Sequence, residues 1–179
     1  MKIKRGKGGS VEFAGKKVVA LAMWDDIEKA LIVKVTYNEK EVIISSPGEY
    51  EYSGLGIVAI EATSDKYSGK INLARISVDG VSALFVPQDF SVSKEVKDLM
   101  GVCNILVVSN INPANLKTLV DNFNSEFVVI DAQNNLEEYS KVLKKQFGVD
   151  NLVSESVISL EEKDFDTEED TPITFVQLA

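Results

Sequence analysis

The 179-residue sequence contains no histidine and only one cysteine, Cys103. Most protein zinc sites use imidazole or thiolate ligands, and histidine is the commonest general base near neutral pH. The composition therefore excludes Ser-His-Asp and Cys-His triads, a two-histidine-one-carboxylate iron site, a histidine-ligated haem and a thiolate zinc site. A carboxylate, lysine or tyrosine site remains open, as does the absence of catalysis.

Positive charge and long hydrophobic runs are also scarce. The formal net charge is −9 at pH 7, which disfavours binding to nucleic acid or to anionic lipid, although the chain starts with a short basic cluster, Lys2, Lys4, Arg5 and Lys7. No apolar run approaches the roughly 18 residues that span a bilayer, and the start lacks the features of a secretory signal. One unpaired cysteine fits a reducing compartment. We therefore expect a cytoplasmic protein with neither a nucleic-acid nor a membrane partner.

Length and composition are those of a single globular domain. Hydrophobic residues make up 45% of the chain and charged residues 26%, close to the globular averages. A chain of this size buries enough apolar surface to fold without disulfides or structural metals. We predict one domain over residues 1–179.

The first half of the chain has the pattern of short strands separated by turn residues. Lys16-Lys17 suits a hairpin tip, and Ser46-Pro47-Gly48 suits a turn. Asp79-Gly80 is a two-residue hairpin turn, and the slipped alternation before it predicts a bulge at Ala74-Arg75. Strands are expected at residues 3–5, 11–13, 18–23, 31–35, 42–45, 56–62, 71–78 and 81–86.

The second half alternates buried-strand and amphipathic-helix patterns. Asn112-Pro113 is a typical helix start, and Phe147-Gly148 a typical helix end. An acidic run over 161–170 is expected to be a solvated surface loop. Helices are expected at 93–100, 113–123 and 136–147, with strands at 105–108, 127–130 and, as a suspected edge strand, 173–178. The fold class is therefore mixed α/β, layered, with a β-rich first half.

The string Ser46-Pro47-Gly48-Glu49-Tyr50-Glu51, followed by an apolar strand, resembles a recurring segment of the metallo-β-lactamase fold superfamily. The branch most similar to it is the ascorbate-phosphate-lactonase-like group of hydrolases, which often has G-P-G-E-Y-E in this place. The order of elements around the string also matches that branch. The resemblance covers residues 11–132 and implies two packed sheets with helices outside.

The resemblance also implies a two-metal site, but its motifs are degenerate here. The family's H-x-H-x-D-H follows a strand that matches residues 30–36, and the chain has Tyr37, Glu39 and Val42 at histidine positions, with Glu41 at the aspartate position. Asp89 stands where the family has its bridging aspartate. The resemblance also places Asp25 at the corner after an early strand, and Asp131 or Ala132 near the last ligand.

Two interpretations of these residues remain. Asp25, Glu39, Glu41, Asp89 and Asp131, all expected near strand ends, would bind Mg²⁺ or Mn²⁺ through oxygen if they converged. Alternatively, strand ends favour Asp and Asn for backbone reasons, and the side chains are separately solvated. We favour the second interpretation. Cys103 is expected to be a buried small hydrophobe, since no histidine is present to activate it.

The functional expectation is a catalytically inactive, metal-free relative of metallo-β-lactamase-fold hydrolases with a binding or structural role and no cofactor. The first alternative is a hydrolase of a small phosphorylated or lactone substrate that uses an oxygen-only Mg or Mn site. The second is a structural subunit that pairs with an active paralogue through the suspected edge strand, whereas the leading expectation includes self-association as a homo-oligomer.

Overall fold

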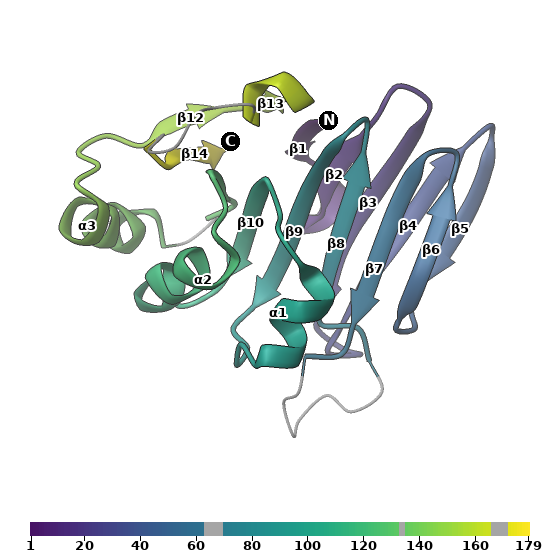
Figure 1. The fold of residues 1–179 in the computed structure, drawn as a ribbon, viewed down its shortest axis with the longest axis horizontal. Helices are drawn as coiled ribbons and strands as arrows, with labels where there is room; N and C mark the ends of the chain where they lie inside the picture. Colours follow the sequence, from purple (N-terminus) through teal and green to yellow (C-terminus); the bar gives the residue numbers. More distant parts are fainter. Residues whose placement is uncertain (63–69, 133–134, 166–171) are drawn as a thin grey trace.

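The computed structural model describes residues 1–62, 70–132, 135–165 and 172–179. In this part of the chain, two β-sheets pack face to face, and helices cover the outer face of one of them (Figure 1). The mixed α/β class predicted from the sequence is confirmed. None of the described helices has the length and apolar character needed to span a bilayer.

The first sheet has six antiparallel strands in the order β13-β1-β2-β3-β4-β5. Successive strands of the N-terminal region form hairpins, including the one predicted at Lys16-Lys17. The strands are β1 (Lys2–Arg5), β2 (Val11–Ala14), β3 (Val18–Asp25), β4 (Ala30–Tyr37), β5 (Lys40–Ile44) and β13 (Val157–Ser159).

The second sheet has eight strands in the order β12-β14-β11-β10-β9-β8-β7-β6. In this order, neighbouring strands from β12 to β9 run parallel to each other. Neighbouring strands from β9 to β6 run antiparallel to each other. The strands are β6 (Gly48–Tyr52), β7 (Leu55–Ile60), β8 (Leu73–Val78), β9 (Val81–Gln88), β10 (Ile105–Asn110), β11 (Phe127–Ile130), β12 (Val153–Glu155) and β14 (Thr174–Leu178).

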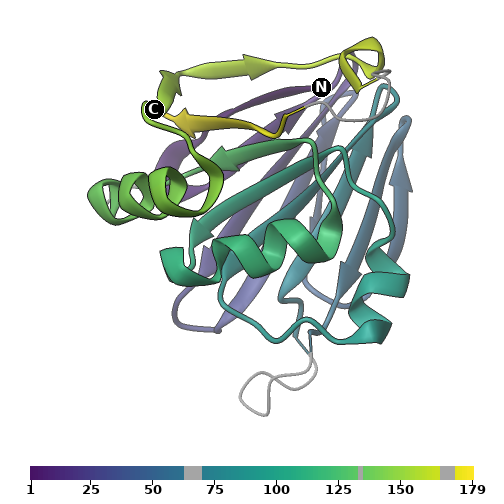
Figure 2. The ribbon, with the colours of Figure 1, turned by 60° about the vertical axis from the view of Figure 1, so that its left-hand side comes forward.

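The described residues form three α-helices, which lie on the outer face of the eight-stranded sheet, as Figure 2 shows: α1 (Lys94–Met100), α2 (Leu116–Phe123) and α3 (Leu136–Phe147). Three of these helix termini have a local cause in a capping residue. The Ser93 side chain accepts a hydrogen bond from the Val96 amide, and Asn112 accepts one from Ala114 ahead of α2. Gly148 ends α3 with a φ of 72°. Short 3₁₀ turns are found at Lys7–Gly9, Pro113–Asn115 and Glu162–Phe165.

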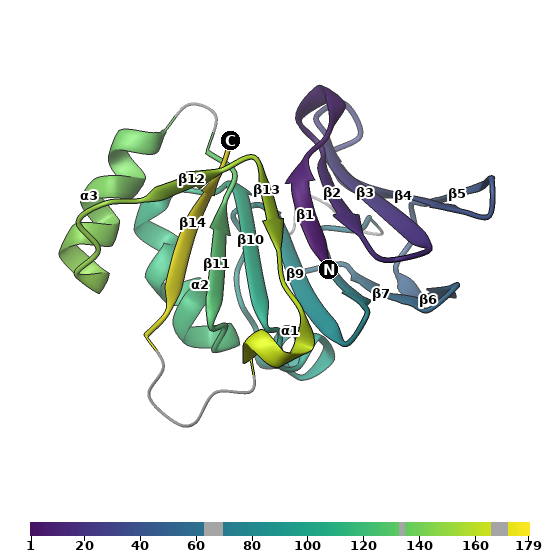
Figure 3. The ribbon, with the colours of Figure 1, turned by 90° about the horizontal axis from the view of Figure 1, so that it is seen from above.

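The buried residues of the described ranges form two hydrophobic cores. One lies between the sheets and includes Phe13 and Phe85, whose ring centroids are 6.0 Å apart. The other lies between the eight-stranded sheet and its helices, and α2 contributes Leu119 and Phe123 to it. No described helix covers the outer face of the six-stranded sheet, so helices flank the sandwich on one side only (Figure 3).

Three local expectations were wrong. The register from Ala74 to Val78 against β9 is continuous, so there is no bulge; the alternation slips because Leu73 and Ala74 are both buried, one in each core. The strand expected over 173–178 is not at an edge, because β14 pairs with β11 on one side and β12 on the other. The segment after Pro47 is not only a turn, since Gly48–Tyr52 forms β6. Residues 166–170 of the acidic run lie outside the described residues.

Candidate functional site

The two ends of the sandwich hold different candidate residues. At one end, which we call the carboxyl end, β9, β10 and β11 finish in parallel, and Asp89 and Asp131 follow the first and last of these strands. The Leu31 amide donates a hydrogen bond to the Ile71 carbonyl, 2.8 Å away, which ties the start of β4 to the segment leading into β8. Since β3 ends where β4 begins, Asp25 also lies at this end.

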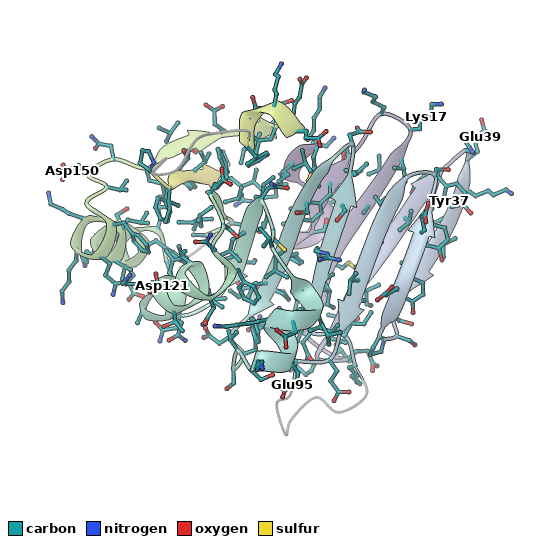
Figure 4. The ribbon with its side chains drawn as sticks, viewed as in Figure 1. Lys17, Tyr37, Glu39, Glu95, Asp121 and Asp150 are labelled. Atoms are coloured by element: carbon teal, nitrogen blue, oxygen red, sulfur yellow. The ribbon has the colours of Figure 1, made fainter. Side chains whose placement is uncertain are left out.

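The remaining candidates lie at the opposite end. Because β4 runs antiparallel to β3, it carries Tyr37 away from Asp25, and Glu39 and Glu41 follow in the β4–β5 hairpin. Figure 4 shows Tyr37 and Glu39 at the upper right of the molecule, away from Glu95 at the bottom, which lies in the first turn of α1 shortly after Asp89. The structure therefore does not bring the five carboxylates together.

Asp131 is the one candidate carboxylate that is buried, with a side-chain exposure of 0%. Its Oδ1 accepts two hydrogen bonds from Arg5, from Nε at 2.9 Å and from Nη2 at 2.5 Å, and its Oδ2 lies 3.4 Å from the Ser109 hydroxyl. The same Nη2 donates to the Leu178 carbonyl at 2.8 Å. Arg5 thus joins β1 of one sheet to the ends of β11 and β14 of the other, and it neutralises the carboxylate.

Tyr139 reaches the same end from α3. It is 1% exposed, and its hydroxyl donates toward the carbonyls of Ile111 and Ser109, at 3.1 and 3.3 Å. Burial raises the pKa of Tyr139 well above its ordinary range, and the negative charges of Asp89 and Asp131 raise it further. The phenol therefore stays protonated and acts as a hydrogen-bond donor that anchors α3 to the strand ends.

Asp89 is exposed and organises the connection that precedes α2. Its two carboxylate oxygens accept hydrogen bonds from the Asn112 amide and from Nδ2 of Asn115, both at 2.9 Å. Both oxygens are thus committed to the turn that begins at Asn112, and the side chain has a structural function in forming it.

Asp25, Glu41 and Tyr37 also have local structural partners. Asp25 Oδ1 accepts from the Ile27 and Glu28 amides, at 2.9 and 3.0 Å, and so closes the β3–β4 turn. Glu41 forms an ion pair with Lys34 of the neighbouring strand, at 2.5 Å. The Tyr37 ring packs on Tyr52, with centroids 5.5 Å apart, so these two tyrosines make a cross-sheet contact.

Glu39 occupies a turn position with a φ of 61°, next to Asn38 with a φ of 46°. Two successive residues with positive φ form the two-residue hairpin turn that matches strand twist. The chain accordingly passes from β4 directly into β5, with no loop between them in which a metal-binding motif would lie.

The candidate residues do not form a metal centre in the described part of the chain. No group of three or more His, Cys, Asp or Glu side chains there has a geometry that would hold a metal ion. Two grooves, of about 650 and 510 Å³, are lined by none of the six candidates. The arrangement at the carboxyl end is a hydrogen-bonded clamp between the sheets.

Sequence reasoning missed Arg5, Ser109 and Tyr139 as partners at this end. Arg5 was counted only as part of a basic start, and no local pattern links it to Asp131, 126 positions away. A usable signal was Asp131 itself, because a carboxylate directly after the buried strand Phe127–Ile130 needs a counter-charge. The chain contains only two arginines, Arg5 and Arg75, and both are half-buried.

Comparisons with protein-family models, with curated proteins and with solved structures found no match for this chain. Its class is therefore defined by its architecture alone: a mixed α/β protein of two facing sheets with helices on one outer face.

Proposed function

We infer that this chain is a non-catalytic, metal-free relative of the metallo-β-lactamase-fold hydrolases, whose scaffold serves a binding role in the cytoplasm. The observation that carries the proposal is the Arg5–Asp131 pair. At Asp131, which the resemblance places near the corner of the family's last metal ligand, a guanidinium supplies the positive charge. A cation at this position would have to displace Arg5 from a carboxylate that has no exposed surface.

The arrangement of the strands supports the same proposal. Asp89 and Asp131 follow parallel strands and lie at one end of a two-sheet sandwich, where the resemblance expects metal ligands. The third expected region, Tyr37 to Glu41, lies at the other end because β4 forms a hairpin with β3. A scaffold that retains two aspartates and lacks the third group of ligands has lost the means to hold two metals.

The first test is a metal analysis of the purified full chain, combined with thermal denaturation in the presence of added Mg²⁺, Mn²⁺ or Zn²⁺. We expect no stoichiometric metal and no shift of the midpoint. Screening for esterase, lactonase and phosphodiesterase turnover is expected to find none. Asp89→Asn and Glu41→Gln provide a matched pair of controls, because each removes one exposed negative charge, at the carboxyl end and at the opposite end respectively.

Stoichiometric metal that is lost in Asp89→Asn but kept in Glu41→Gln would overturn the proposal. Metal-dependent turnover that is lost in Asp89→Asn but kept in Glu41→Gln would also overturn it. Either outcome would favour the oxygen-only Mg²⁺ or Mn²⁺ hydrolase instead.

A further inference from the structure

The strand β6 forms one edge of the eight-stranded sheet, and it pairs only with β7. Ser53 and Gly54, with φ values of 52° and 81°, make the two-residue turn between them, so the closing pair Tyr52–Leu55 is hydrogen-bonded. Hydrogen-bonded and non-hydrogen-bonded pairs alternate along an antiparallel ladder. The N–H and C=O groups of Glu49 and Glu51 therefore point away from β7, toward the open side seen in Figures 1 and 3.

The outer face of this edge carries unneutralised negative charge. Glu49 and Glu51 are exposed, and neither forms an ion pair with any lysine or arginine in the described residues. The edge of the other sheet differs, because Glu41 of β5 pairs with Lys34. Two like charges two residues apart on a free edge favour a positively charged neighbour.

A groove of about 510 Å³ lies on the same face, beside the two carboxylates. Its floor is open because Gly56, opposite Glu51, has no side chain, and an added Cβ would approach Ser77 Cβ no closer than 4.0 Å. The opposite wall includes Arg75, whose Nη1 donates to the Met100 carbonyl at the end of α1, at 2.5 Å. The groove thus has room for the long aliphatic part of a basic side chain whose cationic group reaches Glu49 and Glu51.

The inner side of the same strand is apolar. Tyr50 and Tyr52 are half-buried and pack against the core between the sheets, and Tyr52 contacts Tyr37 across the gap. A strand added next to β6 would therefore direct alternate side chains toward two different surroundings, one acidic and one aromatic.

We propose that the β6 edge takes up an extended segment of another protein, in which basic residues alternate with apolar ones, as an additional strand of the eight-stranded sheet. The inference deepens the binding role proposed above and rests on it. A second copy of this chain fits poorly, since antiparallel β6–β6 pairing about Tyr50 would place Glu49 of one copy opposite Glu51 of the other.

The test uses the full-length protein and a short, blocked, fluorescent peptide in which Lys alternates with Val and Tyr. Fluorescence anisotropy is expected to show binding that weakens as salt is added. The double variant Glu49→Gln/Glu51→Gln should weaken it roughly fivefold, the effect of losing two exposed charge pairs. Glu49→Lys/Glu51→Lys should abolish it and allow binding of the matching Glu-Val-Tyr peptide.

The control variant Glu137→Gln/Glu138→Gln makes the same change in net charge at the exposed start of α3, and it should bind the peptide as the parent does. Amide hydrogen exchange should show new protection at Glu49 and Glu51 when peptide is bound. Peptide with N-methyl groups on the residues that face β6 should not bind. Absence of binding by the lysine peptide, equal binding by the charge-reversed variant, or protection confined to other strands would each overturn the inference.

These outcomes are independent of the metal test. If the protein binds no peptide, holds no metal and shows no turnover, the strand addition is refuted and the non-catalytic proposal stays in place. Metal-dependent turnover with intact peptide binding would do the reverse.

Discussion

Arg5 directs two of its N–H groups at a single oxygen, Oδ1 of Asp131, although the two residues lie 126 positions apart and in different sheets. The carboxylate is buried, whereas the arginine side chain is 28% exposed. The interaction joins the first strand of the chain to the end of a parallel strand in the second half. It therefore couples the two sheets at the end of the sandwich where the family resemblance expects metal ligands.

The first prediction concerns this ion pair. Arg5→Met leaves a buried, unpaired carboxylate, so we expect it to lower the free energy of unfolding by about 3 kcal/mol, the lower end of what breaking a buried pair costs. Asp131→Leu alone should also destabilise. The double variant should recover much of the loss, because both charges are then absent. Urea denaturation of the parent, the two single variants and the double variant measures the coupling free energy between the two residues. Losses of unfolding free energy that simply add in the double variant would contradict this prediction.

The second prediction concerns the phenol of Tyr139. Tyr139→Phe keeps the ring in the core but leaves the Ile111 and Ser109 carbonyls without their donor, which should cost about 1–2 kcal/mol. Tyr52→Phe, at the half-exposed edge, provides a control with the same chemical change and a smaller expected effect. The two losses of stability are compared by the denaturant midpoints of the variants, provided that the m-value is unchanged. An equal effect of the two substitutions would contradict the anchoring function.

The third prediction uses Cys103. Burial raises the pKa of its thiol from an ordinary value near 9 to about 11, an effect that the positive charge of Arg75 reduces only in part. Because the folded state holds the thiol proton more tightly, this contribution to stability is complete below pH 9 and is lost between about pH 9 and 11. Cys103→Ala should therefore reduce the fall in stability over that interval.

The same burial predicts slow reaction of Cys103 with thiol reagents at pH 8, since only the thiolate attacks. Reaction is expected to become fast in denaturant. Rapid modification of the native protein would show that Cys103 is accessible.

The fourth prediction concerns Asp89 as a turn-forming residue. Asp89→Ala removes the acceptor for Asn112 and Asn115 and should lower stability by about 1 kcal/mol. The loss should be equal with and without Mg²⁺ or Mn²⁺. Thermal denaturation in both conditions tests this, and a metal-dependent difference that Asp89→Ala abolishes would point to a cation site.

The hairpins and the helices could be predicted because their signals are local. Asp79-Gly80 sets positive φ at two successive residues, 52° and 78°, and so places β8 beside β9. The strand Phe127–Ile130 and the helix Leu136–Phe147 match the predicted ranges, since continuous apolar runs and a 3.6-residue period identify them. No local pattern in the sequence indicates to which of the two sheets a strand belongs or which strands are its neighbours.

The strands that the sequence did not indicate are short or polar. β12 and β13 have three residues each, and all but one of these six residues are exposed, so neither shows apolar alternation. They form because β14 and β1 already present free edges to them. The pairing of β12 with β14 also explains why the strand expected at an edge, over 173–178, lies inside the sheet.

The chain's composition was sufficient to exclude histidine-dependent catalysis, because no conformation supplies a residue type that is absent. Local patterns were sufficient to predict the hairpins and helices, since their energetics depend on neighbouring residues. The partners of Asp131 and the separation of the carboxylates between two ends were decided by strand direction and sheet pairing. Those depend on contacts between residues far apart in the chain, and spacing along the sequence does not encode them.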